Sequence, residues 1–439
     1  MRVLFAMFEG GGNLSLILPV VARLVDRGHD VRVLAGPNVR AGRAPMTERF
    51  LPRIRATGAT PVVLFTPTPH PFDDAHFGWT PRWLDRITPN CPPLVWSRAW
   101  AEGVRDELAR AGAHVVAADF ILLGALAGAE AAGVPAAALV HGTWKHRPAP
   151  GIPPYGTGFL PSRSLVGRLR AAPFNVLFEW RYRRDGLPPL NASRHSVGLP
   201  PLRSPFEQFD HAERVLLLSS ATFDMPPQPL PQNVRYVGAP VERTPDAAWR
   251  PPWPAGDPRP LVLVSLSTLH QGQGPVMQRV IEAAGGLPVR ALVTLGPSLD
   301  RSEFVGPPNT VIEAFVPHDV VMPFAGVMVT QCGLGTLAKA LAVGLPLVCI
   351  PILADQPGNA ALVVARGVGV RLSPRSRSPE IARAIMQVLS EPRFREAAKQ
   401  LSSRISREDG ALNAALELEG LAEPTTAGRA PDTVMTGGL

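Results

Sequence analysis

The sequence predicts an α/β protein made of two doubly wound, Rossmann-like domains that face each other across a cleft. Apolar runs that suit buried parallel strands alternate with stretches of helical spacing along most of the chain. A proline-rich stretch interrupts this alternation near the middle of the chain. The chain has 439 residues, of which 46% are hydrophobic, and this is enough apolar material for two ordinary domains.

The first domain is predicted over residues 1–220. It opens with the apolar run RVLFAMF, a glycine-rich turn, the helical stretch LILPVVARLVDRG that stops at Gly28, and the apolar run VRVLAG. A strand, a glycine-terminated helix and a second strand form a βαβ unit, which implies a parallel sheet with right-handed crossovers. Further buried strands are predicted at 61–65, 114–119, 135–141 and 214–220.

Residues 221–258 are predicted to be an interdomain linker, because eleven prolines fall between Ala221 and Pro260. The second domain is predicted over 259–403, with strands at 261–266, 289–296, 310–315, 326–330 and 346–350. Residues 404–422 are helical in composition and are expected to pack back on the N-terminal domain. Residues 423–439 have the composition of a disordered tail.

The charge distribution argues against nucleic acid as a partner. The formal charge of +8 comes almost entirely from scattered arginines, since the lysines are Lys145, Lys339 and Lys399. A nucleic-acid stripe would concentrate basic residues and aromatics on one element. The densest basic stretch, 163–184, is interpreted first as a solvated helix face and second as a patch for a membrane surface or an acceptor.

Cysteine usage and hydropathy predict a cytoplasmic protein with no transmembrane segment. Cys91, Cys332 and Cys349 have neither the number nor the spacing of a disulfide framework or a zinc site, so a reducing compartment is expected. No run approaches the roughly 20 apolar residues that a membrane span needs, and the apolar run Met1 to Phe8 is too short for the core of a signal segment.

Two predicted strand-to-helix loops of the second domain suit an anion. Ser267 and Thr268 with a glycine-rich segment follow one strand, and Gln331-Cys332-Gly333-Leu334-Gly335-Thr336 follows another and leads into the helix LAKALAV. Glycines allow a ligand to approach the backbone, and a helix N-terminus attracts negative charge. Facing one another, the loops would suit a diphosphate. The structural alternative is a pair of tight turns, with Thr336 capping the helix.

The segment PILADQPGNA (351–360) favours a ligand site over the interpretation of these loops as simple turns. Asp355, Gln356 and Asn359 cluster there, and carboxylates and amides are suited to the hydroxyls of a sugar ring. The structural alternative is that Asp355 caps the following helix. Upstream, FVPHD (315–319) would hold a flat base, or would simply be a strand end followed by a proline turn.

A nicotinamide enzyme is a formal alternative. Gly333 to Ala338 satisfies the dinucleotide fingerprint G-x-G-x-x-G/A, and Asp355 lies about 20 residues beyond it. However, that acid sits several residues past the predicted strand end. The turn Gly10-Gly11-Gly12 also lacks the third glycine and the acid of the fingerprint.

Taken in order, AFVPHD, VTQCGLGTLAKALAVGLPLVCIPILADQPGNA and VVARGVGVRL resemble the donor-binding region of the family 1 glycosyltransferases of GT-B fold. The resemblance is closest to bacterial enzymes that decorate natural products of macrolide or polyketide type. VSLST (264–268) and the N-terminal unit ending in RGHD fit the same family. The resemblance extends over nearly the whole chain, to about residue 420.

The resemblance implies a cytoplasmic enzyme that transfers a sugar from UDP or dTDP to a hydrophobic small-molecule acceptor with inversion. The nucleotide sugar would be a co-substrate, with no further cofactor and no metal; a homodimer is left open. The positions matching the donor site are Ser267, Thr268, Gly333, Gly335 and Thr336 at the diphosphate, Val316 and His318 at the base, and Asp355 and Gln356 at the sugar.

Two positions depart from that family. Its acceptor-activating histidine, oriented by an aspartate that matches Asp119, falls on Asn13 here, and a histidine near the diphosphate falls on Gln331. Asparagine does not accept a proton near neutral pH, and glutamine carries no positive charge. Either the acceptor needs little deprotonation, or another base substitutes, or the fold now serves a donor-independent reaction such as cyclisation or elimination, or a non-catalytic role.

Substitute bases are sought in the first domain. Asp119 is one candidate, and His141, at the end of the predicted strand 135–141, is a second. His70 and His76 lie in a loop that also carries Asp73 and Asp74; without a geometry, this loop is weak evidence for a metal site. His29 follows the helix-ending Gly28 and is interpreted as structural.

Overall fold

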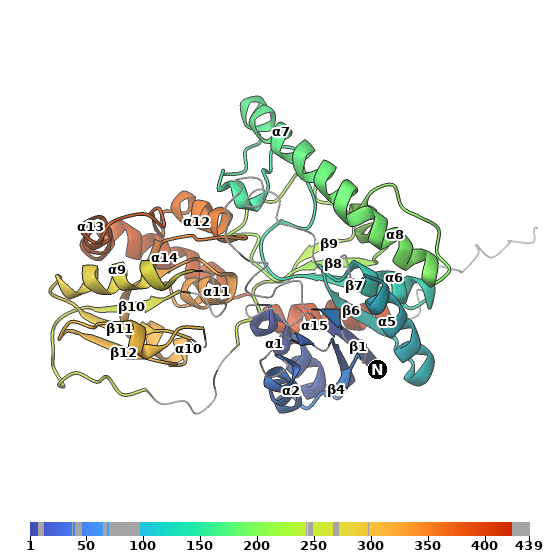
Figure 1. The fold of residues 1–439 in the computed structure, drawn as a ribbon, viewed down its shortest axis with the longest axis horizontal. Helices are drawn as coiled ribbons and strands as arrows, with labels where there is room; N and C mark the ends of the chain where they lie inside the picture. Colours follow the sequence, from blue (N-terminus) through green and yellow to red (C-terminus); the bar gives the residue numbers. More distant parts are fainter. Residues whose placement is uncertain are drawn as a thin grey trace, which may run out of the picture.

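The computed structural model describes residues 1–7, 13–36, 38–39, 46–64, 68–69, 97–242, 244, 249–266, 272–296 and 298–423. These residues form two α/β domains, each built on a parallel sheet (Figure 1). The expected fold class of two doubly wound domains is therefore confirmed. The loop with His70 and His76, the segment with Ser267 and Thr268, Cys91 and the tail 424–439 lie outside the described residues.

The N-terminal domain is built on a seven-stranded sheet in the order β4-β2-β1-β6-β7-β8-β9. All of its recorded pairings are parallel. The strands are β1 (Arg2–Met7), β2 (Asp30–Ala35), β4 (Thr60–Val63), β6 (Val115–Asp119), β7 (Ala136–Val140), β8 (Arg214–Leu217) and β9 (Val234–Tyr236). A separate two-residue pair joins β3 (Asn38–Val39) to β5 (Thr68–Pro69).

Helices cover both faces of this sheet, which explains its continuous apolar strands. Val3 to Met7 in β1 are at most 1% exposed, as a strand buried on both faces requires. The helices are α1 (Leu14–Asp26), α2 (Met46–Ala56), α5 (Ser97–Ala111), α6 (Leu123–Ala131), α7 (Leu165–Arg181) and α8 (Leu187–Ser196). Helix α6 lies directly on α5, because a Cβ at Gly124 would sit 1.9 Å from the Ser97 carbonyl oxygen.

The C-terminal domain is built on a six-stranded parallel sheet in the order β12-β11-β10-β13-β14-β15. Its strands are β10 (Leu261–Ser265), β11 (Arg290–Thr294), β12 (Thr310–Glu313), β13 (Ala325–Thr330), β14 (Leu347–Cys349) and β15 (Gly369–Arg371). Its helices are α9 (Gly274–Gly285), α10 (His318–Val321), α11 (Leu334–Ala342), α12 (Gln356–Ala365), α13 (Ser378–Ser390) and α14 (Pro392–Ile405).

The expected domain boundary at residue 220 is wrong. Strand β9 pairs with β8, so the first sheet extends into the segment that was assigned to the linker. The buried Asp224 carboxylate accepts hydrogen bonds from the Tyr236 hydroxyl and the Trp144 backbone N–H, both at 2.6 Å. These bonds tie the proline-rich segment to the N-terminal domain, which its composition alone does not reveal.

The C-terminal helix α15 (Gly410–Ala422) lies against α1, far from the sheet that precedes it in sequence (Figure 1). Arg27 pairs with Glu419 through two hydrogen bonds of 2.6 and 2.8 Å, and Asn413 donates to the Val237 carbonyl at 2.9 Å. His29 lies between Glu419 and the N-terminal amine, so its structural role is confirmed. The chain end thus links the two domains a second time.

Helix α7 and the residues after it carry the dense basic stretch. The helix projects from the body of the molecule (Figure 1). Arg183 pairs with Glu179 and Arg184 with Asp185, as in a solvated helix face. No helix in the described parts of the chain has the length and apolar character to cross a membrane.

His146 provides a test of the N-terminal packing. It is 3% exposed, lies between Trp144 and Phe209, and neither ring nitrogen has a hydrogen-bond partner. Burial, and to a lesser degree Arg147, lower the pKa of His146 from 6.5 to about 3. At pH values between about 3 and 6.5, His146 is protonated in the unfolded chain but not in the native protein. The free energy of unfolding therefore falls as the pH is lowered below 6.5.

His146→Phe should therefore flatten the pH dependence of the unfolding free energy, by up to about 1.4 kcal/mol per pH unit below pH 6.5. Urea unfolding of both proteins at several pH values measures this slope. His195→Gln, at an exposed position, is the matched control and should leave the slope unchanged. An unaltered slope in His146→Phe would show that this histidine does not resist protonation.

Candidate active site

Three polar side chains of the N-terminal domain meet at the carboxyl ends of neighbouring strands. Asn13 follows β1, Asp119 ends β6, and His141 follows β7. These strands lie side by side in the sheet, and the order of connections reverses between β1 and β6. Parallel sheets bind ligands at such switch points, beyond the carboxyl ends of the strands. The sequence-predicted candidates Asn13, Asp119 and His141 are thus brought together.

The Asp119 carboxylate organises this group. It is fully buried and accepts a hydrogen bond of 2.7 Å from the Asn13 side-chain amide on Oδ2 and one of 3.2 Å from the Ile121 backbone N–H on Oδ1. His141 Nε2 lies 3.3 Å from the same Oδ1. This approach brings the charges together but lacks the direction of a hydrogen bond, since Nε2 has no such partner.

The His141 ring lies between Asp119 and solvent. Its Nε2 is buried next to Asp119, whereas 18% of the side chain remains exposed. The Phe120 ring meets it edge to face at a centroid distance of 4.9 Å. A proton on Nε2 would face the Asp119 carboxylate and leave the lone pair of the neutral ring on Nδ1.

The loop after β13 presents a helix N-terminus. Gly333 occupies the N-cap position of α11 without a side-chain bond, so Thr336 lies inside the first turn and the alternative of Thr336 as the cap is wrong. Cys332 has a φ of +67°, a strained value for a residue with a side chain. Its carbonyl accepts a 3.0 Å hydrogen bond from Asn359 Nδ2, which holds the loop in this shape.

Gln331 lies over the start of this loop. It is 7% exposed, and its Nε2 is 2.9 Å from the point where a Cβ at Gly333 would sit. The amide nitrogen is therefore beside the helix N-terminus, where it can donate a hydrogen bond to an anion but supplies no charge. Burial raises the pKa of the Cys332 thiol well above its usual range, so the thiol is neutral too.

Asp355 faces the other domain. It stands at the N-cap position of α12 but makes no capping bond, so the alternative that it is a helix cap is wrong. Its Oδ2 lies 2.9 Å from the Lys145 ammonium, which comes from the N-terminal domain. Burial opposes ionisation of Asp355, but Lys145, helped by His141, outweighs it, and the net effect is a lowered pKa.

Gln356 belongs to the turn before α12. It is 3% exposed, and its side-chain oxygen accepts hydrogen bonds from the backbone N–H groups of Ile352 and Leu353 at 2.8 and 2.9 Å. Ala354, in the same turn, has a φ of +53°. The Gln356 oxygen thus shapes the loop that presents Asp355, a use that the sequence did not predict.

Val316 and His318 lie near the start of α10. Val316 is 9% exposed, and His318 Nε2 lies 3.0 Å from Thr294 Oγ1, at the end of β11. Burial, and then Lys339, lower the pKa of His318 to about 4, so the ring is neutral at neutral pH. A neutral ring and an apolar side chain suit contact with a flat, uncharged base.

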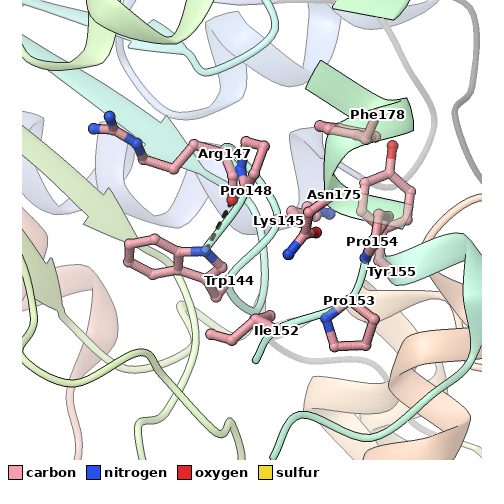
Figure 2. Close-up of a pocket in the computed structure, with 10 residues that line it drawn as sticks. All are labelled: Trp144, Lys145, Arg147, Pro148, Ile152, Pro153, Pro154, Tyr155, Asn175 and Phe178. Carbon is pink, nitrogen blue, oxygen red and sulfur yellow. Dashed lines mark hydrogen bonds between the residues drawn. The ribbon is translucent and has the colours of Figure 1, made fainter. Parts of the chain in front are cut away.

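An apolar hollow opens beside Lys145 in the N-terminal domain. Figure 2 shows side chains from the loop after β7 and from α7 converging on it. Trp144 Nε1 donates to the Arg147 carbonyl at 3.0 Å, and Asn175 donates to the Ala149 carbonyl at 2.9 Å, which leaves Asn175 Oδ1 buried without a partner. The lining residues are Trp144, Lys145, Arg147, Pro148, Ile152, Pro153, Pro154, Tyr155, Asn175 and Phe178.

The nicotinamide alternative is not favoured by this geometry. The acid that would bind a ribose should end the strand after the fingerprint helix. Strand β14 ends at Cys349, whereas Asp355 lies beyond it in a loop and pairs across the domains with Lys145. Lys145 was not predicted from the sequence to be a site residue. Its position four residues after His141 was the one indication that it lies near the site.

Comparisons with known proteins show which family the chain resembles. Residues 279–412 match the family described as erythromycin biosynthesis protein CIII-like, C-terminal domain. The chain is 30% identical to 4'-demethylrebeccamycin synthase of Lentzea aerocolonigenes, covering 96% of this chain and 99% of that protein. It is 26% identical to O-mycaminosyltylonolide 6-deoxyallosyltransferase of Streptomyces fradiae, covering 98% and 100%. The crystal structure of the glycotransferase of kitacinnamycin shares the fold, with a TM-score of 0.73, 21% identity and coverage of 96% and 98%.

Gly142 tests the close approach of the two domains. Its φ is +137°, and a Cβ there would lie 2.6 Å from Leu334 Cδ2, at the start of α11. Gly142→Ala should lower the unfolding free energy by about 1–3 kcal/mol through backbone strain plus this clash. The same substitution made in Leu334→Ala should be less harmful, because the clash with Leu334 is gone and only the backbone strain and the 3.2 Å approach to Lys145 Nζ remain. Equal losses in both backgrounds, measured by chemical denaturation, would mean that the domains do not meet here.

Proposed function

The chain belongs to the family 1 glycosyltransferases of GT-B fold that act in natural-product biosynthesis, and we propose that it transfers a sugar from a nucleoside diphosphate to a hydrophobic acceptor with inversion. The observation that carries the proposal is the approach of His141 to Asp119 in the N-terminal domain, opposite the donor-type loops of the C-terminal domain. His141 is therefore the proposed base, because Asn13 cannot accept a proton.

In the proposed reaction the acceptor hydroxyl attacks C1 of the sugar on the face opposite the diphosphate. A bond forms between the acceptor oxygen and C1, and the bond between C1 and the phosphate oxygen breaks. That electron pair leaves on the diphosphate, and the hydroxyl proton passes to His141 Nδ1. Asp119 stabilises the resulting imidazolium, while the Asn13 amide fixes the carboxylate that orients the ring.

The donor is proposed to lie along the loops at the carboxyl ends of the second sheet. The N-terminus of α11, with Gly333, Gly335 and Thr336, faces the diphosphate. Val316 and His318 flank the base, and the Asp355 carboxylate accepts bonds from sugar hydroxyls. UDP and dTDP both suit this arrangement. The nucleotide sugar is the co-substrate, and the proposed chemistry uses no resident metal or further cofactor.

The acceptor is proposed to lie on the N-terminal domain near His141, beside the small hollow lined by Trp144, Ile152 and Phe178. The apolar side chains there favour an apolar molecule. A donor-independent cyclisation or elimination is not favoured, since two of the proteins named above are called a deoxyallosyltransferase and a glycotransferase, and His141 is available as a base. A product that appears without any sugar nucleotide, seen by mass spectrometry, would reverse this preference.

Nucleoside diphosphate binding tests the donor site. Millimolar UDP or dTDP should raise the melting temperature, because a ligand that binds only the native state stabilises it. Asp355→Ala should weaken binding of the sugar nucleotide more than that of the diphosphate alone, since the carboxylate contacts the sugar. Absence of any shift with either nucleotide, together with no effect of Asp355→Ala, would refute the donor site.

His141→Gln tests the proposed base. The variant should lower kcat by about 10²–10⁴-fold, because the acceptor proton has no base to receive it, while the affinity for the donor stays within about twofold. His195→Gln, at an exposed position, is the matched control. Steady-state kinetics with mass-spectrometric detection of the glycosylated product give both values.

Asn13→His, added to His141→Gln, tests whether the rate is lost because a base is missing. The Asn13 amide already donates to Asp119 Oδ2 at 2.7 Å, so an imidazole at position 13 can use the same carboxylate. Part of the lost rate should return. Full activity of His141→Gln alone would exclude His141 as the base.

A further inference from the structure

Lys145 is a lysine of the N-terminal domain that reaches into the donor loops of the C-terminal domain. It lies on the loop after β7, and only 5% of its side chain is exposed. Its ammonium is 2.9 Å from Asp355 Oδ2 and 5.6 Å from the centroid of the Phe120 ring. A charge this buried needs strong compensation, which one carboxylate and one aromatic face supply only in part.

The ammonium also lies near the side chain of Leu334, the first residue of α11. A Cβ at Gly142 would be 3.2 Å from Lys145 Nζ and 2.6 Å from Leu334 Cδ2. The lysine head therefore approaches the part of the C-terminal domain where this helix begins. An ammonium and a helix N-terminus are both sources of positive potential.

The ammonium has hydrogen-bonding capacity left. It carries three N–H donors, and within the described ranges its recorded hydrogen bond goes to Asp355. The loop after β13 offers the neutral side chains Thr330, Gln331 and Cys332 beside the helix N-terminus. A leaving diphosphate gains negative charge, and these side chains do not neutralise it.

We propose that Lys145 binds the β-phosphate of the donor and stabilises the negative charge that develops on it. The inference rests on the proposed function. As the bond between C1 and the phosphate oxygen breaks, its electron pair passes to that oxygen, and the Lys145 ammonium attracts the charge without giving up a proton. The bond to Asp355 fixes the ammonium in place before the donor arrives.

One consequence concerns the domains. The β-phosphate contact comes from the acceptor domain and the helix N-terminus from the donor domain, so the phosphate site is complete only when the two are together. Gly142, with no side chain, permits the approach.

The experiment measures nucleotide affinity by titration calorimetry in the full chain, with UDP or dTDP and with the corresponding monophosphate. Lys145→Met should weaken the diphosphate by about tenfold or more and leave the monophosphate within about twofold, because the contact is to the β-phosphate. Lys145→Arg should retain most of the affinity. Asp355→Asn removes the negative charge but keeps the ammonium and a side-chain oxygen that can accept its hydrogen bond, so it should weaken the diphosphate much less than Lys145→Met does.

The double variant Lys145→Met with Asp355→Asn leaves no unpaired buried carboxylate, so it separates loss of the contact from loss of folding. It should bind the diphosphate as weakly as Lys145→Met. Recovery of affinity in the double variant, or equal losses for diphosphate and monophosphate, would overturn the proposal and leave a structural ion pair. If the unaltered protein binds neither diphosphate, the proposed function fails and this inference with it; a diphosphate bound equally by the unaltered protein and Lys145→Met refutes Lys145 alone.

Discussion

The buried carboxylate of Asp119 is the constraint around which the N-terminal half of the site is organised. A carboxylate with no exposure needs hydrogen-bond donors or positive charges around it, and the groups around Asp119 follow three different strands. The Asn13 amide and the Ile121 N–H satisfy it directly, and the His141 ring approaches to 3.3 Å. Asn13 therefore keeps a role in positioning the carboxylate although it cannot accept a proton. The proposed base, His141, follows the neighbouring strand β7.

A second electrostatic contact couples the two domains. Lys145 and Asp355 are each largely buried and each come from a different domain, so neither charge is compensated unless the domains meet. Two further contacts join the domains: Asn413 of α15 donates to the Val237 carbonyl, and Arg366 of the C-terminal domain donates to the Phe223 carbonyl at 2.9 Å. The acceptor-side base and the donor-side helix N-terminus are thus kept facing one another by contacts outside the reacting groups. Catalysis and interdomain geometry depend on the same few charges.

The sequence predicted the two parallel sheets because strands buried on both faces leave continuous apolar runs, such as Val3 to Met7. It also named Asp119, through the resemblance to the family, and His141, because it stands at the end of a predicted strand. Their contact depends on β6 and β7 being neighbours, which local patterns do not encode. The assignments of caps to Thr336 and Asp355 failed because α11 begins two residues before Thr336 and because Asp355 is drawn to Lys145. Lys145 carries no local motif, so only the assembled domains reveal it.

The pH dependence of the single-turnover transfer rate tests the proposal that His141, beside Asp119, receives the acceptor proton. With saturating donor, the rate should rise with pH through one ionisation to a plateau, and His141→Gln should lose both that ionisation and most of the rate. His318 does not interfere near neutral pH, because burial holds its pKa at about 4. The same ionisation and the same plateau in His141→Gln would contradict the account.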